Sequence, residues 1–376
     1  MIRLLDLSAQ YRELETEIHA AIRRVFETSQ FVLGQEVAAF EDEFADYCGA
    51  QYAVGVNSGT SALHLALLAA GIGEGDEVIT TPFTFYATVA AIGYVGATAA
   101  YVDIDPVTFN LDTRKIEAAI TDRTRAILPV HLYGQPADMD PILDIARRHK
   151  LLVIEDAAQA HGAEYRERRV GGIGDLACFS FYPSKNLGAA GEGGMVTTNN
   201  PDYARAVASL RNWGEDRRYH PVLKGYNYRM EGLQGAILRV KFRRLEPWTE
   251  ARRALAAKYD RLLEDSAVTR PHAAGDVRHT YCLYTIRSQD RDGLQRGLEA
   301  AGIQTAVHYP LPIHLMPAYA DARYKAGDFP CAEACAQSVL SLPLHAHMAA
   351  GEVEQVSEQI LKLRPKANQE TIVSGR

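Results

Sequence analysis

Short apolar runs alternate with helical patterns between about residues 50 and 200, and this alternation constrains the fold more than any other feature of the sequence. The runs typical of strands are rich in β-branched residues, and they read AVGV, DEVITT, AAYVDI, RAILPVHLY and LLVIEDA. Helical patterns such as SALHLALLAAG and MDPILDIARRHK lie between them. Strands separated by helices form right-handed crossovers, so we predict an α/β fold with a mainly parallel sheet covered on both faces. Ligands of such sheets bind at the carboxyl ends of the strands.

The chain has 376 residues, which is long for a single hydrophobic core, and its last third differs in texture. Long charged helical stretches follow residue 200, and strand and helix patterns such as HTYCLYTIRS and RDGLQRGLEAAG come after them. We expect a large domain over residues 1–252, which begins with an amphipathic helix, and a smaller α+β domain over residues 253–363. The polar tail, residues 364–376, has no apolar face, and we expect it to be mobile.

Charge and composition argue against several functional classes. The net charge is −7 with both signs scattered, so no basic stripe is present for nucleic acid. The most apolar stretch, residues 87–102, is interrupted by glycines and is shorter than the roughly 20 residues that span a bilayer. The first residues do not resemble a secretion signal, and five cysteines without zinc-ligand spacing fit a reducing compartment. We therefore expect a cytoplasmic protein that binds neither nucleic acid nor membrane.

The stretch VGVNSGTSALHLAL places small polar residues between a short strand and an apolar helix. Gly59, Thr60 and Ser61 stand at the start of this helix, where free backbone amides and hydroxyl groups attract an anion. The same residues also make an ordinary helix N-cap, and this stretch alone favours that simpler role.

In the stretch LLVIEDAAQAHGA, polar residues that include Asp156 and Gln159 lie at the carboxyl end of a predicted strand. A carboxylate here is equally compatible with a helix cap, a general base or a counter-charge for a protonated ring nitrogen. Metal binding by Asp156 and His161 lacks a third ligand at recognisable spacing, so we expect no metal site.

Lys185 follows the strand pattern LACFSFY and precedes a run of small residues, GAAGEGG, that allow a ligand close to the backbone. A lone lysine is usually a solvated surface residue. Here Lys185 and Asp156 follow strands whose ends converge at one edge of the sheet. A phosphate cradle, a carboxylate for a pyridinium nitrogen and a lysine for an aldehyde together describe a site for pyridoxal 5′-phosphate. The glycine fingerprint of nicotinamide enzymes and the P-loop motif are both absent, which argues against a nucleotide-binding oxidoreductase.

Five motifs in order resemble the DegT/DnrJ/EryC1/StrS family of nucleotide-sugar aminotransferases: NSGTSAL, EDAAQAHGA, FSFYPSKNLGAAGEGG, GYNYRMEGLQGAIL and VHYPLPIHLMPAY. The resemblance covers nearly the whole chain. It implies the aspartate aminotransferase-like fold, known as fold type I, a homodimer with active sites at the subunit interface, and L-glutamate as amino donor.

The resemblance also implies roles for single residues. Lys185 would hold the cofactor aldehyde and Asp156 would face the ring nitrogen, and these two are the expected catalytic residues. Gln159 would contact the ring hydroxyl and Phe85 would stack on the ring. The implied phosphate ligands are Gly59, Thr60, Ser61, Ser180 and, from the partner subunit, Asn227.

On the substrate side, the resemblance implies that Arg229, His308 and Tyr309 line the sugar site. Some family members are dehydratases with histidine at the lysine position, so Lys185 favours transamination. Gln159 in its motif resembles members that aminate 3-ketosugars, and the 3-aminosugar is the expected product. A 4-keto nucleotide sugar, a cyclitol of the scyllo-inosose type and a non-catalytic regulator on the same fold remain as alternatives.

Overall fold

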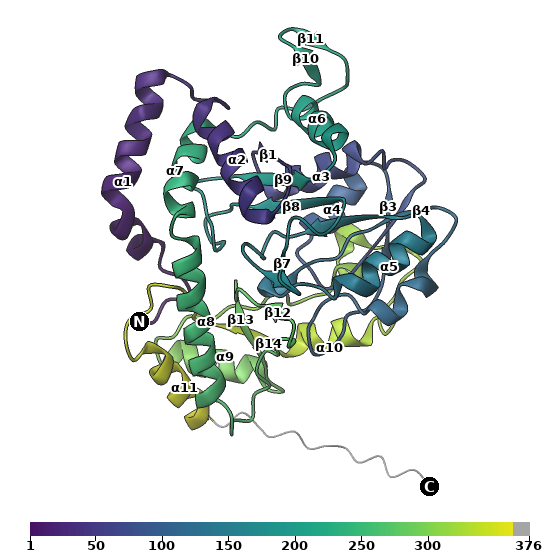
Figure 1. Cartoon of the computed structure of the whole chain (residues 1–376). Coiled ribbons are helices and arrows are strands. Elements are labelled where there is room, and N and C mark those ends of the chain that lie inside the picture. Colours follow the sequence, from purple (N-terminus) through teal and green to yellow (C-terminus); the bar gives the residue numbers. More distant parts are fainter. Residues whose placement is uncertain (364–376) are drawn as a thin grey trace.

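A seven-stranded sheet forms the centre of the larger part of the molecule in this computed structural model, which describes residues 1–363 (Figure 1). The strand order is β1-β9-β8-β5-β4-β2-β3. Only β9 runs against the others, since β1 and β8 both pair with it in antiparallel fashion and the remaining pairs are parallel. The bounds of the strands are β1 Tyr52–Val56, β2 Glu77–Thr80, β3 Thr98–Tyr101, β4 Thr124–Ile127, β5 Leu152–Asp156, β8 Leu176–Ser180 and β9 Gly194–Thr198. The predicted α/β fold with a mainly parallel sheet is confirmed.

Helices cover both faces of this sheet. On one face α3 (Gly59–Ala69) packs on β8 and β9 and against α4 (Ala87–Tyr94) and α6 (Pro201–Leu210). On the other face α2 (Gln35–Cys48) lies on β1 and β9, and α5 (Met139–His149) lies on β4 and β5. A sheet covered on both faces buries its strands on both sides, and β2, for example, is buried along its whole length.

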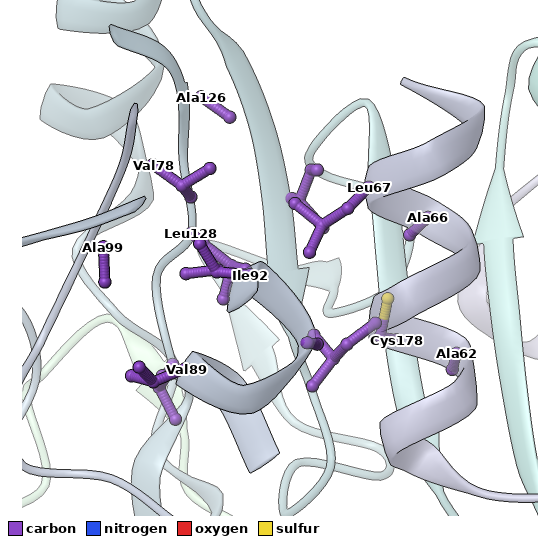
Figure 2. Packing of buried hydrophobic residues seen from close by; sticks show 14 of the residues in the cluster. Ala62, Ala66, Leu67, Val78, Val89, Ile92, Ala99, Ala126, Leu128 and Cys178 are labelled. Atoms are coloured by element: carbon purple, nitrogen blue, oxygen red, sulfur yellow. The ribbon is translucent and has the colours of Figure 1, made fainter. Parts of the chain in front are cut away.

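The helix α3 shows why this layer is rigid. Its side chains are buried on every side because it is covered by the sheet beneath it and by α4 and α6 around it. Figure 2 shows Ala62, Ala66 and Leu67 of α3 in one cluster with Ile92 of α4 and Cys178 of β8. The small alanines let the helix approach the sheet closely, and close packing fixes the position of its first turn.

The amphipathic N-terminal helix is confirmed as α1 (Leu7–Thr28), which lies at the left edge of Figure 1 beside α7 (Gly232–Phe242). Its buried residues follow helical spacing and face α7: Gln10, Leu14, Ile18, Ala21 and Val25. The Asp6 side chain caps the helix by accepting a hydrogen bond of 2.9 Å from the Ala9 amide.

A smaller α+β part follows the long helix α8 (Leu245–Leu262). Its two-stranded sheet joins β13 (Tyr284–Arg287) to β14 (Val339–Leu342), and α9 (Arg291–Ala300) and α11 (Glu352–Leu363) pack near α8. The remaining elements are β6 Glu164–Tyr165, β7 Arg168–Arg169, β10 Glu215–Arg217, β11 His220–Pro221, β12 Val277–Arg278 and α10 Pro330–Ser338, with five short 3-10 turns.

The predicted boundary between residues 252 and 253 falls inside α8, and the division into domains 1–252 and 253–363 stays a prediction. The expected mobile tail, residues 364–376, lies outside the described residues. Among residues 1–363, no helix combines the length and the apolar character that crossing a bilayer requires.

Candidate active site

A cavity of about 480 Å³ opens where the carboxyl ends of the central strands meet the smaller part of the chain. It brings together most of the residues that the sequence singled out, although they come from widely separated segments. The predicted residues that line it are Gly59, Thr60, Phe85, Asp156, Gln159, Ser180, Lys185, His308 and Tyr309.

The first turn of α3 forms one end of the cavity. Ser58 caps the helix, since its hydroxyl accepts from the Ser61 amide at 3.0 Å and bonds the Ser61 hydroxyl at 2.9 Å. Ser61 therefore completes the cap and does not line the cavity. No hydrogen bond among the described residues uses the amides of Gly59 and Thr60, so both remain available to an anion.

Only glycine fits at position 59. A β-carbon there would lie 2.6 Å from Cβ of Ser180 and 3.2 Å from its Oγ, closer than non-bonded carbons approach. The absence of a side chain thus lets the helix start lie directly against the end of β8. The Ser180 hydroxyl accepts from the Tyr182 amide at 3.3 Å, which leaves its own proton free to bind an acceptor in the cavity.

Asp156 ends β5 and is almost completely buried. The Thr88 hydroxyl donates to its Oδ2 at 2.8 Å, and the Ala158 amide donates to its Oδ1 at 3.2 Å. Burial raises the pKa of the Asp156 carboxyl, while these two hydrogen bonds and the nearby charge of Lys185 lower it. The carboxylate is thereby fixed in direction at the base of the cavity.

A buried pair beside this strand end was not assigned a role by sequence reasoning. His131 Nδ1 accepts from the Ala137 amide at 3.0 Å, so its Nε2 carries the proton and donates to Glu155 at 2.9 Å. Glu155 also accepts from the amides of Gly171, Ile173 and Gly174. The Glu155 carboxylate thus ties the loop before β8 to the end of β5.

Lys185 lies in the loop between β8 and β9 and is half-buried. Its amide donates to the Tyr182 carbonyl at 2.9 Å, which closes a tight turn. A β-carbon on Gly188 would meet the Pro183 carbonyl oxygen at 2.4 Å, so glycine is needed for the chain to fold back here. Lys185 lines the cavity, where burial, helped by the charge of Lys185, lowers the pKa of His308 to about 4.

The Gln159 amide is held in one orientation. Its Oε1 accepts from the Tyr133 backbone amide at 2.7 Å, and its Nε2 donates to the Tyr309 hydroxyl at 3.0 Å. One Nε2 proton and the Tyr309 hydroxyl proton are left for a ligand. Burial raises the pKa of the Tyr309 hydroxyl, so it remains a neutral donor.

Two further side chains shape the opening of the cavity. Phe85 is partly exposed, and its ring centroid lies 5.9 Å from that of Tyr309. His308 Nδ1 hydrogen-bonds to the Ser341 hydroxyl of β14 at 2.9 Å, which ties this segment to the smaller sheet. The cavity is therefore closed jointly by the two parts of the chain.

Asn227 and Arg229 lie outside the lining of this cavity. Arg229 Nε donates to Asn227 Oδ1 at 3.0 Å, and its Nη1 donates to Asn212 Oδ1 at 3.3 Å. Arg229 instead lines a shallow hollow next to the β10–β11 hairpin, together with Arg217 and Arg218. The roles expected for Asn227 and Arg229 stay predictions.

Sequence reasoning also missed Thr88 and Arg252, which line the cavity. Thr88 is a single polar residue in an apolar helix, and Arg252 is one of several arginines in the charged helix α8. Neither position carries a local motif, so only the three-dimensional arrangement identifies them.

Comparison with known proteins places the chain in a family. The model of the DegT/DnrJ/EryC1/StrS aminotransferase family matches residues 12–361. This chain belongs to that family. The predicted family and the aspartate aminotransferase-like fold are thus confirmed.

Similar proteins include a transaminase of a nucleotide sugar and a protein named as a regulator. The chain is 45% identical over 98% of its length to dTDP-3-amino-3,4,6-trideoxy-alpha-D-glucose transaminase of Streptomyces venezuelae, of which the match covers 97%. It is 48% identical over 96% of its length to a pleiotropic regulatory protein of Geobacillus stearothermophilus, again with 97% of that protein covered.

Solved structures agree with this assignment. The fold matches S. venezuelae DesV in complex with a ketimine intermediate at a TM-score of 0.95, with 45% identity and coverage of 98% of this chain and 99% of that one. It also matches NtdA from Bacillus subtilis with bound cofactor PMP at a TM-score of 0.89, with 31% identity and coverage of 97% and 85%.

Proposed function

We propose that this family member is a pyridoxal phosphate-dependent aminotransferase that transfers the amino group of L-glutamate to the C3 keto group of a nucleotide-linked sugar. The observation that carries this proposal is the presence of Lys185 and Asp156 in one cavity, beside amides at the start of α3 that bond to no described residue. A lysine, a buried carboxylate and an anion cradle are the three groups that this cofactor needs.

The residues of the cavity fit the cofactor. Gly59 and Thr60 offer amides, and Ser180 offers a hydroxyl proton, where a phosphate would be held. Gln159 keeps one Nε2 proton for the ring hydroxyl, and Phe85 offers a ring face at the opening. When bound, pyridoxal phosphate supplies an aldehyde that exchanges with amines and a ring that accepts electrons as a proton leaves the substrate carbon.

The protein's own residues then have distinct tasks. Asp156, ionised, would keep a proton on the ring nitrogen, and the hydrogen bonds from Thr88 and Ala158 fix its two carboxylate oxygens. Lys185 would hold the aldehyde at rest, and its Nζ, once released, would move a proton to and from the carbon that carries the amino group. One lysine thereby covers attachment and proton transfer.

The C3 position is supported by the name of the S. venezuelae relative, a transaminase of a 3-amino sugar. His308 and Tyr309 line the cavity, and His308 is bonded to β14 of the smaller sheet, so we place the sugar on this side. The name of the G. stearothermophilus relative favours a regulatory function as the second candidate. A regulator without catalysis has no need for both Lys185 and the buried Asp156.

We further propose a homodimer in which the partner completes each site. Tyr86 at the start of α4 and Tyr94 at its end are exposed aromatic side chains. Exposed apolar surface of this kind is typical of interfaces between proteins. The β10–β11 hairpin stands away from the body of the molecule at the top of Figure 1 and carries Arg217 and Arg218. Asn227, near its base, would reach the phosphate of the partner's cofactor.

Mixing inactive variants tests this shared site. In the proposed dimer, Lys185 and Asn227 of one site come from different subunits. A mixed dimer of Lys185→Ala and Asn227→Ala subunits therefore contains one intact site. After unfolding and refolding the two together, activity should return to about a quarter of the wild-type value. Activity that stays at the level of the separate variants contradicts the shared site.

We also propose a cytoplasmic location. The described residues include all five cysteines, and none of them forms a disulfide there, as expected in a reducing compartment. Fractionation of cells that express the tagged protein tests this location.

The substrate is tested with a panel of nucleotide-linked 3-ketosugars and 4-ketosugars. The protein is incubated with L-glutamate and each sugar, and release of 2-oxoglutarate is measured together with the mass of the aminosugar. Turnover should be fastest with a 3-ketosugar. Preference for 4-ketosugars would reassign the position of transfer, and no turnover with any sugar contradicts the enzymatic proposal.

A further inference from the structure

Arg252 is a buried cation that lines the active-site cavity without an acidic partner. It lies in the middle of α8, and only 5% of its surface is exposed. Among the described residues it forms no ion pair, not even with Asp156 or Glu192, the two acids that line the same cavity. Buried charges are normally paired, so this guanidinium lacks the counter-charge that burial demands.

Two partly buried arginines of the chain do have such partners. Arg211 pairs with Glu41, and Arg278 pairs with Glu246 and Glu250. Arg252 is instead held by carbonyl groups, since its Nη1 donates to Leu344 at 2.8 Å and to Tyr281 at 3.4 Å. These two hydrogen bonds fix the plane of the guanidinium without neutralising it.

The rest of the guanidinium is free. Nε and Nη2 have no hydrogen-bond partner among the described residues. Neither atom is completely covered by the protein, so both can still bind a ligand. Arg252 lines the cavity, and we infer that these donors face it. Together they form one edge of the guanidinium, which matches the two oxygens of a carboxylate.

The surroundings favour a small, partly aliphatic anion. Leu4, Leu5, Leu342 and Leu344 line the same cavity. The neighbouring His345 is neutral near pH 7, because burial, helped by the Arg252 charge, lowers its pKa to about 4. A bulky diphosphate is better served by the exposed arginines of the β10–β11 hairpin.

We propose that the Nε and Nη2 edge of Arg252 binds a carboxylate of the amino donor. The inference rests on the proposed function and deepens it, since it names the residue that recognises the amino acid substrate. It requires no change in the roles of Lys185 and Asp156.

The test uses Arg252→Gln, which removes the charge, and Arg252→Lys, which keeps the charge but not the planar edge. Arg253→Gln is the matched control, because Arg253 is the next residue of α8 and lies outside the cavity lining. Three quantities are measured for cofactor-loaded protein: the Kd of glutarate by calorimetry, the KM of L-glutamate and the KM of the ketosugar. Thermal unfolding of each variant reports whether it folds.

Both Arg252 variants should weaken binding of glutarate and of L-glutamate about tenfold or more, as expected for loss of a charged hydrogen-bonded pair. The KM of the ketosugar and all values for Arg253→Gln should stay within about twofold of wild type. L-alanine as a second amino donor shows which of the two carboxylates of L-glutamate binds to Arg252. A weaker affinity for both donors indicates the α-carboxylate, and a weaker affinity for L-glutamate alone indicates the side-chain carboxylate.

The proposal would be overturned if Arg252→Lys bound glutarate and L-glutamate as tightly as wild type. It would also be overturned if the variant had a raised KM for the ketosugar but an unchanged KM for L-glutamate. Failure of the proposed function is distinguishable. In that case the wild-type protein transfers no amino group to any sugar, while glutarate binding still reports on Arg252.

Discussion

The hydroxyl of Thr88 donates a hydrogen bond of 2.8 Å to Oδ2 of Asp156, which links the first turn of α4 to the end of β5. Burial raises the pKa of Asp156, and this hydrogen bond is the strongest influence that lowers it. The pair therefore governs whether Asp156 is ionised when it faces a protonated ring nitrogen.

Replacement of Thr88 by valine should lower kcat about tenfold, because a hydrogen bond to a charged group is lost while the shape is kept. The pKa of Asp156 should rise further, so the acidic limb of the pH–rate profile should move to higher pH. Steady-state kinetics from pH 5 to 9 measure both effects.

Thr80→Val is the matched control for this change. Thr80 is also a buried threonine, but its hydroxyl donates to the Leu128 carbonyl at 2.8 Å, away from the cavity. This variant should lose some stability and keep the wild-type pH profile. An identical shift of the profile in both variants would contradict the role given to Thr88.

Gly59→Ala should weaken binding of pyridoxal phosphate about tenfold, because the new methyl group must push Ser180 away from the start of α3. Fluorescence titration of the cofactor-free protein measures this affinity. Gly93→Ala serves as control, since residue 93 is exposed in α4 and its β-carbon would meet nothing within 4 Å. That variant should bind the cofactor normally and be more stable by up to about 1 kcal/mol.

Buried histidines should make the protein less stable in mild acid. Burial, and to a smaller degree Lys185, lowers the pKa of His161 to about 3, and burial with Arg253 lowers that of His279 to about 3. Between pH 6.5 and these values the unfolded chain binds protons that the folded chain does not, so stability falls as pH falls through this window. Above pH 6.5 the histidines are largely neutral in both states, so this loss of stability is absent.

His161 allows this contribution to be isolated, because neither of its ring nitrogens has a partner among the described residues. From pH 7 to pH 5, wild type should lose about 2 kcal/mol more than His161→Leu, measured by urea unfolding. The exposed His272→Leu variant should retain the wild-type slope. Equal slopes for wild type and His161→Leu would show that His161 does not titrate in this way.

The fold was accessible from the sequence because its strands carry a strong local pattern. Runs such as LLVIEDA begin with consecutive apolar residues, as is typical of strands covered on both faces, and β5 lies where this run predicts it. The β10–β11 hairpin was not predicted, because its charged stretch RNWGEDRRYH lacks the alternation of a strand buried on one face.

The site was accessible only where its residues follow strand ends. Asp156 and Lys185 are placed by β5 and β8, whose carboxyl ends meet at one edge of the sheet. Thr88 and Arg252 are placed by tertiary packing alone, at 68 and 96 residues from Asp156 along the chain. Likewise, the close approach of Gly59 to Ser180 joins segments that have no local relationship in the sequence.

Covalent trapping of the cofactor tests the central claim most directly. Protein loaded with pyridoxal phosphate is treated with borohydride and digested, and the peptides are analysed by mass spectrometry. The cofactor should be attached at Lys185, and Lys185→Ala should bear no label and transfer no amino group from L-glutamate. Label at another lysine, or amino transfer by Lys185→Ala at the wild-type rate, would contradict the account.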